Sequence, residues 1–271
     1  MPEKNAPDEL GPLAARPVTV DPVAMARRDL NKALPRRFYK EAAAHKRDGG
    51  FVLLLDGRVA KTPGGRDLVL PTLSAARAVA AEWGDLGEII DPALMPWTRI
   101  VNSAIDGVVH RLAATAEEIV KYAGSDLVCY RAGEPEALAR AQAAAWDPVL
   151  AFARKKLGAS FLCTQGLVFI EQPEAASLAV KEAIARIADD GPAAPFVLAA
   201  LLVMTTLTGS ALLALAVAHD ALTAAEAWRA AHVDEDFEIR ACGEDTEALR
   251  RRTRQWCEME AAAGLYQAVS G

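Results

Sequence analysis

Residues 191–218 limit the fold of this chain more than any other segment, because they carry no formal charge. A stretch of this length can span a bilayer. Its middle, residues 205–210 (TTLTGS), is polar, and each apolar run beside it has only the ~8–11 residues of a buried core helix. No Lys/Arg cluster or aromatic belt flanks it. We therefore expect two helices buried in a protein core, with a membrane segment as the alternative.

The charge balance is acidic and excludes one class of protein. Lys+Arg is 30 and Asp+Glu is 36, a formal net charge of −6, which argues against a dedicated nucleic-acid binder because no cationic excess is available for phosphates. Hydrophobic residues at 52% and charged residues at 24% are typical of a globular protein. The four cysteines, Cys129, Cys163, Cys242 and Cys257, form no C-x-x-C motif, and such scattered cysteines fit a reducing compartment.

The first third of the chain predicts a small α+β domain over residues 31–95, after a flexible tail at residues 1–30. The tail has neither a secretory signal nor an Arg-rich transit pattern. We expect strands at residues 36–41, 51–55, 58–61 and 67–70, with a hairpin turn at Asp56-Gly57. A small meander needs a cover. The spacing of residues 72–83 predicts a helix that supplies it, capped by Thr72.

Helical patterns dominate from there on and predict an all-α domain over residues 96–271. Apolar residues from Trp97 to Val108 form one stripe, and capping boxes are expected at residues 115–118 and 223–226. A long helix should open at residues 134–135, kink at Pro148 and end at Gly158. Residues 161–164 and 167–170 are either strands or extended loop. The predicted fold class is α+β: a small antiparallel β-rich N-terminal domain with a covering helix, then a mainly α-helical C-terminal domain.

Short catalytic signatures are absent from the sequence. It contains no P-loop, no G-x-G-x-x-G after a strand, no H-E-x-x-H and no G-x-S-x-G. These absences weaken an enzymatic interpretation.

The densest acidic site is residues 232–238 (HVDEDFE). On a helix, His232 and Asp236 would share one face, as a metal site requires. The same pattern also fits a solvated helix face. Phe237 within the acidic cluster favours a third interpretation, a protein-contact surface, because an aromatic anchor ringed by charge is typical of interface hot spots. We therefore predict Asp234, Glu235, Asp236 and Phe237 as partner contacts.

A second cluster lies at residues 95–106 (MPWTRIVNSAID). The spacing of Arg99, Asn102 and Asp106 places them on one helix face, where they either hold the two domains together or touch a partner. Trp97, with Trp83, is predicted as a structural anchor near the domain junction.

Many short motifs stand in order along the chain and together resemble one family. They are 37–40 (RFYK), 54–58 (LLDGR), 61–63 (KTP), 68–71 (LVLP), 81–83 (AEW), 90–92 (IDP), 95–96 (MP), 102–106 (NSAID), 126–127 (DL), 129–131 (CYR), 142–148 (QAAAWDP), 233–237 (VDEDF) and 243–245 (GED). The chain resembles the assembly chaperones that escort the alpha subunit of the F-type ATP synthase catalytic head. The resemblance covers residues 36–250.

The resemblance implies a non-enzymatic chaperone that binds the free alpha subunit and releases it to beta. It implies no cofactor, no metal, no nucleic acid and no membrane insertion, and we expect a monomer when the protein is free. The acidic N-terminus fits a bacterial cytoplasm, with the mitochondrial matrix as the location if the source is eukaryotic. Two alternatives remain open: a metal- or carboxylate-dependent enzyme that uses Asp234, Glu235 and Asp236 with His232, and a membrane-attached module that uses residues 191–218.

Overall fold

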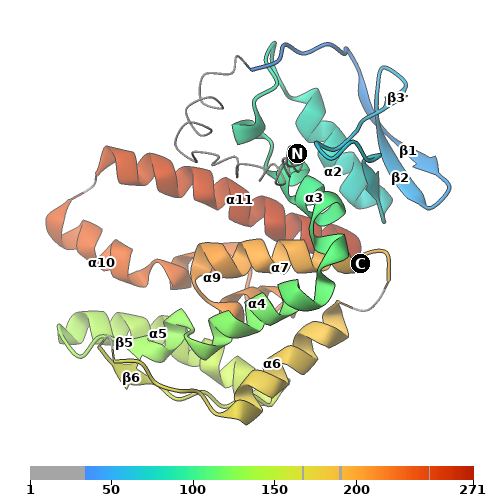
Figure 1. The fold of residues 1–271 in the computed structure, drawn as a ribbon. Coiled ribbons are helices and arrows are strands. Elements are labelled where there is room, and N and C mark those ends of the chain that lie inside the picture. Colours follow the sequence, from blue (N-terminus) through green and yellow to red (C-terminus); the bar gives the residue numbers. More distant parts are fainter. Residues whose placement is uncertain (1–33, 167, 189–190, 244) are drawn as a thin grey trace, which may run out of the picture. The chain divides into compact units, whose positions relative to one another are not determined.

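A small antiparallel sheet with its covering helix stands at the N-terminal end of the described chain, and helices make up most of the remainder (Figure 1). The structure, a computed structural model, describes residues 34–166, 168–188, 191–243 and 245–271. This order of elements confirms the predicted α+β fold class. The flexible tail predicted for residues 1–30 lies outside the described residues.

Strand β2 (Gly50–Leu55) is the centre of the sheet. It pairs antiparallel with β1 (Ala42–Arg47), with β3 (Arg58–Val59) and with β4 (Val69–Leu70). The predicted hairpin turn is confirmed, because Asp56 and Gly57 have φ values of 46° and 77°, the positive values that a primed turn requires.

The strand predicted for residues 36–41 is wrong, because the first strand is β1. The backbone N–H of Glu41 donates to the Asp56 carboxylate at 2.8 Å rather than to a long ladder. Asp48 and Gly49, the latter with a φ of 88°, form the turn that folds β1 onto β2. Three alanines in β1, which are poor strand formers, concealed this strand in the sequence pattern.

Helix α2 (Leu73–Gly84) packs against β1, β2 and β4, as the predicted covering helix should. Its predicted cap is confirmed, since the Thr72 hydroxyl accepts from the backbone N–H of Ala75 at 3.2 Å. Ala75, Ala76 and Val79 are fully buried in this contact. The Tyr39 hydroxyl donates to the Trp83 carbonyl at 2.7 Å and holds the segment before the sheet against the end of the helix.

Helix α3 (Pro96–Asp106) follows a 3-10 turn, η1 (Pro92–Leu94), and buries part of the predicted stripe: Ile100, Val101 and Ala104. Contacts of α2 with α3 run across the predicted domain boundary near residue 95, and that boundary stays a prediction. A second 3-10 turn, η2 (Val108–His110), leads into helix α4 (Leu112–Gly124). The predicted end at Gly124 is confirmed.

The capping box predicted at residues 115–118 is wrong. Helix α4 begins at Leu112, so Thr115 lies inside it and is buried. The preceding η2 turn carries the chain directly into the helix, and its N-cap residue Arg111 makes no side-chain cap. The Thr-x-x-Glu spacing is therefore a chance match within a helix.

The middle of the chain contains the short strands β5 (Tyr130–Arg131) and β6 (Thr164–Gln165), which pair parallel. Between them lie helix α5 (Glu136–Phe152) and a π-helical turn, η4 (Ala153–Leu157). The predicted end at Gly158 is confirmed by its left-handed φ of 74°. Of the two segments left open as strand or loop, only Thr164 falls in a strand among the described residues.

Two helices, α7 (Ala194–Thr208) and α8 (Ala211–Ala218), occupy the uncharged segment, as predicted. Gly209, with φ 65°, ends α7, and the Ser210 hydroxyl caps α8 by accepting from the Leu213 N–H at 3.0 Å. Both helices are mostly buried, and α7 packs against α3, α4 and α8. Helix α6 (Glu174–Ile187) packs on α4. Across the described residues, no helix is long and apolar enough to cross a membrane.

A buried carboxylate joins the end of α4 to the start of α8. Asp126, at the N-cap of the 3-10 turn η3 (Leu127–Cys129), is 0% exposed. It accepts from the backbone N–H of Leu212 at 3.0 Å and of Val128 at 3.3 Å. Burial raises its pKa to about 6, although hydrogen bonds from the Ser210 side chain and from backbone N–H groups oppose the shift.

Three helices complete the chain: α9 (Ala224–Ala231), α10 (Val233–Cys242) and α11 (Thr246–Ser270). The capping box predicted at residues 223–226 is confirmed, with Thr223 and Glu226 bonding reciprocally. Helix α11 packs along α7 and also contacts α2, α3 and α9. Figure 1 shows α10 and α11 as a helical hairpin at one end of the helical part.

Candidate functional site

The acidic stretch forms the first turn of α10. Asp234, Glu235 and Asp236 follow His232, the N-cap residue, whose side chain makes no cap hydrogen bond. Acidic side chains are favourable at this end of a helix because they face its unpaired N–H groups. The sequence thus gives α10 a negatively charged beginning.

The three carboxylates have separate partners. Asp234 accepts from the Gln142 side-chain amide at 2.7 Å and thereby joins α10 to α5. Asp236 pairs with Arg252 of α11 at 2.5 Å. Glu235 is exposed, and its carboxylate lies 4.0 Å from Nε2 of the His232 ring. Glu235 is therefore the member of this trio most available to a partner.

Phe237 is half-buried rather than fully presented to solvent. The Arg240 guanidinium lies 6.0 Å from the centre of its ring, and the same guanidinium donates to the Asp236 carbonyl at 2.9 Å. Part of the ring face is thus covered by the chain's own cation.

His232 does not meet Asp236 as a metal site would require. Its ring is buried 3.9 Å from the Trp228 ring, and Nδ1 lies 2.7 Å from the Trp228 carbonyl. Burial lowers the pKa of His232, which favours the neutral ring. No group of three or more His, Cys, Asp or Glu side chains in the described part of the chain could hold a metal ion. The geometry therefore gives the metal-enzyme alternative no support.

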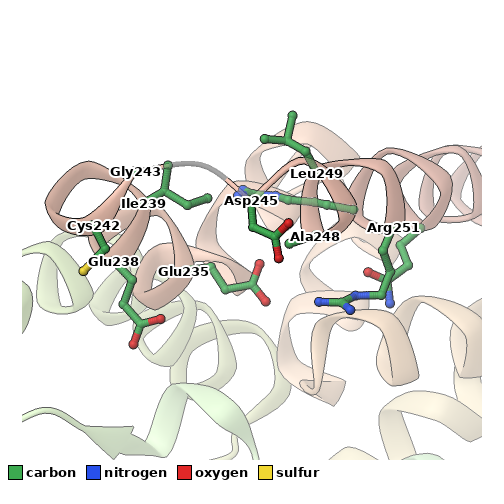
Figure 2. Close-up of a pocket in the computed structure, with 11 residues that line it drawn as sticks. Glu235, Glu238, Ile239, Cys242, Gly243, Asp245, Ala248, Leu249 and Arg251 are labelled. Atoms are coloured by element: carbon green, nitrogen blue, oxygen red, sulfur yellow. The ribbon is translucent and has the colours of Figure 1, made fainter.

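Helices α10 and α11 enclose a groove of about 430 Å³ (Figure 2). Its apolar lining includes Ile239, Ala248 and Leu249, and its charged lining includes acidic and basic side chains: Glu235, Glu238, Asp245, Arg251 and Arg252. Figure 2 shows Glu235, Asp245 and Arg251 pointing into the same space. Asp245 also caps α11 by accepting from the Glu247 N–H at 2.9 Å.

Of the predicted contact residues, only Glu235 lines this groove. Sequence reasoning missed Ile239 and Leu249 because each looks like an ordinary helix residue in isolation. Glu238 belongs to the acidic stretch but was not among the predicted contacts. One feature of the sequence does indicate this site. Two motifs of the family resemblance, residues 233–237 and 243–245, lie at the two ends of one short helix.

The second predicted cluster lies on α3, away from the groove lining. Arg99 pairs with Glu258 of α11 at 2.9 Å. Asp106 accepts from the Thr62 hydroxyl at 2.7 Å and from the Gly64 N–H at 2.8 Å, so it holds the connection between β3 and β4. The Asn102 side-chain oxygen is buried without a hydrogen-bond partner.

The two predicted anchors both contact neighbouring elements. The Trp83 ring N–H donates to the Thr98 hydroxyl at 2.9 Å. The Trp97 ring packs so closely on Gly264 of α11 that a Cβ there would lie 2.7 Å from it. Glu82 caps the start of α3 by accepting from the N–H groups of Trp97 and Thr98, each at 2.8 Å, and burial raises the pKa of Glu82.

Comparison with known proteins gives consistent matches. Residues 36–154 match the family model described as ATP12 chaperone protein. A putative chaperone from Agrobacterium tumefaciens is 42% identical, with a TM-score of 0.82, over 93% of this chain and 92% of that one. Atp12 from Paracoccus denitrificans is 38% identical, with a TM-score of 0.78, over 86% of this chain and 98% of that one. A variant of the Paracoccus protein with one aspartate replaced by lysine matches at 37% identity.

The ordered motifs, the fold and these matches agree over most of the described chain. Family membership implies a protein that works by binding rather than by catalysis. The chain belongs to the ATP12 chaperone family and acts as a chaperone in ATP synthase assembly.

Proposed function

We propose that this chaperone binds the free alpha subunit of the F-type ATP synthase head and releases it to the beta subunit. The observation that carries the proposal is the groove between α10 and α11. Two motifs of the family resemblance meet there: Glu235 comes from one, and Gly243 and Asp245 come from the other. The two motifs lie at the two ends of α10, and their meeting at one groove supports a shared binding role.

The lining of the groove fits an apolar client surface with basic side chains around it. Ile239, Ala248 and Leu249 supply the apolar part. Glu235 and Glu238 are exposed acids beside it, while Arg252 is already paired with Asp236. Complementary charge at the rim of an interface mainly steers association and fixes orientation.

Release needs no nucleotide in this mechanism. A free subunit that normally sits in an oligomer exposes apolar surface and is prone to aggregate. A protein that covers this surface reversibly protects the subunit by mass action, and beta displaces it by binding the same subunit more tightly.

The predicted contact residues take different roles in the proposal. Glu235 contacts the client directly, with Phe237 beside it, while Asp234 and Asp236 hold α10 in place through Gln142 and Arg252. A second contact region is proposed on α3 at Arg99, Asn102 and Asp106. It is secondary, because its two charged side chains are already engaged: Arg99 pairs with Glu258, and Asp106 accepts from the Thr62 hydroxyl and the Gly64 N–H.

The test is capture of purified alpha subunit on the immobilised chaperone, followed by addition of beta. Glu235→Lys should weaken capture by about tenfold, since a repulsive rim charge costs about 1–2 kcal/mol, and should leave the thermal midpoint nearly unchanged. The matched control is Glu117→Lys on α4, an exposed charge reversal outside the groove lining. Equal capture by the wild type and Glu235→Lys would overturn the proposed face, and no capture of alpha by the wild type would overturn the client.

Two further parts of the proposal are the location and the state of the free protein. We place the activity in the bacterial cytoplasm, or in the mitochondrial matrix for a eukaryotic source, with the chaperone monomeric before it binds. Light scattering during size-exclusion chromatography measures the mass of the free protein, and a stable dimer would contradict the monomer.

A further inference from the structure

Two of the four cysteines lie next to each other across a strand pair. Tyr130 of β5 pairs with Thr164 of β6 in parallel register. Cys129, the last residue of η3, and Cys163 are the residues immediately before this pair, so both lie where the two strands begin. The strands that follow them lie ~4.8 Å apart, within the ~4.4–6.8 Å range of Cα separations that a disulfide spans. The Cys163 side chain is close enough to Cys129 to be among the groups that raise the pKa of the Cys129 thiol.

The backbone around Cys163 is held on both sides. Before it, Leu162 exchanges two hydrogen bonds with the Gln172 side chain, at 2.8 and 2.9 Å. After it, the Gly166 N–H donates to the Arg131 carbonyl at 2.9 Å and extends the strand pairing. Cys163 is therefore kept beside Cys129 by contacts that do not involve either thiol.

The two thiols differ in access to solvent. Cys129 is 0% exposed, whereas Cys163 is exposed. Burial raises the pKa of Cys129, and the Asp126 carboxylate adds to the shift. A solute can therefore reach Cys163 first, and Cys129 can act only on a partner that Cys163 brings to it.

We propose that Cys129 and Cys163 are a disulfide-forming pair, a reversible covalent modification site that fastens the segment before β6 to the end of η3. The oxidant is a small disulfide such as oxidised glutathione. The Cys163 thiolate attacks one sulfur of this disulfide, forms a mixed disulfide and releases one glutathione thiolate. Cys129 then attacks the Cys163 sulfur, and its proton leaves with the second glutathione, which is released as the thiol. Two protein thiols are oxidised and one glutathione disulfide is reduced to two thiols.

The cross-link would act on an exposed apolar segment. Three apolar side chains near Cys163 are exposed. Leu162, just before it, is 48% exposed, and Val168 and Phe169, which follow β6, are 72% and 68% exposed. A bond between Cys129 and Cys163 also closes a chain loop that contains the whole of α5. By the loop-entropy argument, the oxidised protein should have a thermal midpoint roughly 5–8 °C higher than the reduced one.

The test treats the full chain with oxidised glutathione, quenches with acid and maps the cysteines by mass spectrometry. The expected result is a loss of about 2 Da, located in a linked pair of peptides that carry Cys129 and Cys163, reversed by dithiothreitol. Cys242 and Cys257 serve as internal controls because both are exposed. Cys257 lies three turns into α11, ~16 Å along its axis, too far from Cys242 for an internal bond, so these two should carry only glutathione.

Two test variants, Cys163→Ser and Cys129→Ser, and one control variant, Cys242→Ser, can refute the proposal. Cys163→Ser, at an exposed position, should abolish the linked peptides and the rise in thermal midpoint, whereas Cys242→Ser should change neither. Cys129→Ser should leave glutathione on Cys163 as the end product. If the wild type also ends with glutathione on Cys163, or if the thermal midpoint rises equally in Cys163→Ser, the proposed pair is wrong.

Discussion

Replacing Asp126 with asparagine tests the balance of forces at the buried link between α4 and α8. In the wild type, the carboxylate accepts from the Leu212 and Val128 N–H groups while fully buried. These hydrogen bonds favour the ionised form, whereas burial favours the neutral form. Burial dominates and raises the pKa of Asp126 to about 6. Asparagine keeps the size and one acceptor oxygen but cannot titrate.

The sign of the pH dependence follows from this shift. An aspartate in the unfolded chain has a pKa of ~3.9, so the folded value is the higher one. The stabilising contribution of the protonated carboxyl is complete below ~pH 3.9 and is lost as the pH rises through about 6. From ~pH 5 to ~pH 7.5, the wild type should lose about 1.4 kcal/mol of folding free energy relative to Asp126→Asn.

Urea unfolding of both proteins at these two pH values measures the difference directly, because other titrating groups cancel. Asp56→Asn is the matched control. Backbone hydrogen bonds from Glu41 and Lys40 lower the pKa of Asp56, so it titrates below this window and its difference from the wild type should be flat. A flat difference between the wild type and Asp126→Asn, or a difference of the opposite sign, would refute the reasoning and assign control to the hydrogen bonds.

Three further substitutions probe contacts in the fold, each measured by urea unfolding. Gly264→Ala should cost about 1–3 kcal/mol, because its Cβ would lie 2.7 Å from the Trp97 ring; Gly84→Ala, with nothing within 4 Å, should be neutral or stabilising, and equal costs would contradict the close packing. Asp106→Ala should lower the free energy of unfolding by about 1–3 kcal/mol, since it leaves the Thr62 hydroxyl and the Gly64 N–H without their acceptor. An unchanged free energy of unfolding would mean that Asp106 does not stabilise the fold. Trp146→Phe should cost about 1–3 kcal/mol by removing the 2.7 Å hydrogen bond to the Ala230 carbonyl, and a neutral result would mean that water or a shift of α9 replaces it.

Local signals predicted those elements whose ends are set by their own residues. Thr72, Gly124, Gly158 and Thr223 each act within one turn of their position, so their roles could be predicted from the sequence. Strand β1 could not, because its pairing depends on β2 rather than on its alanine-rich composition. At Thr115 the sequence predicted a helix start that does not exist. Helix α4 already begins at Leu112, so the capping motif lies inside it.

The sequence predicted the acidic character of the candidate site but not which of its acidic side chains are exposed. The acidic cluster indicated a charged surface, and Glu235 is indeed exposed beside the groove. The sequence could not reveal that Asp234 and Asp236 are engaged by Gln142 and Arg252, which lie on α5 and α11. Whether an acidic side chain is exposed or holds the fold together depends on partners that are distant in the chain. A single sequence does not specify these partners.

Helix α7 has a consequence for how this protein is made. Nearly every side of it is buried, against α3, α4, α8 and α11. Since α11 follows it in the chain, a ribosome exposes α7 before its last neighbour exists. During that interval the nascent chain presents an uncovered apolar helix, the kind of surface that binds chaperones or aggregates. A chaperone of other proteins therefore passes through a stage in which its own central helix needs protection.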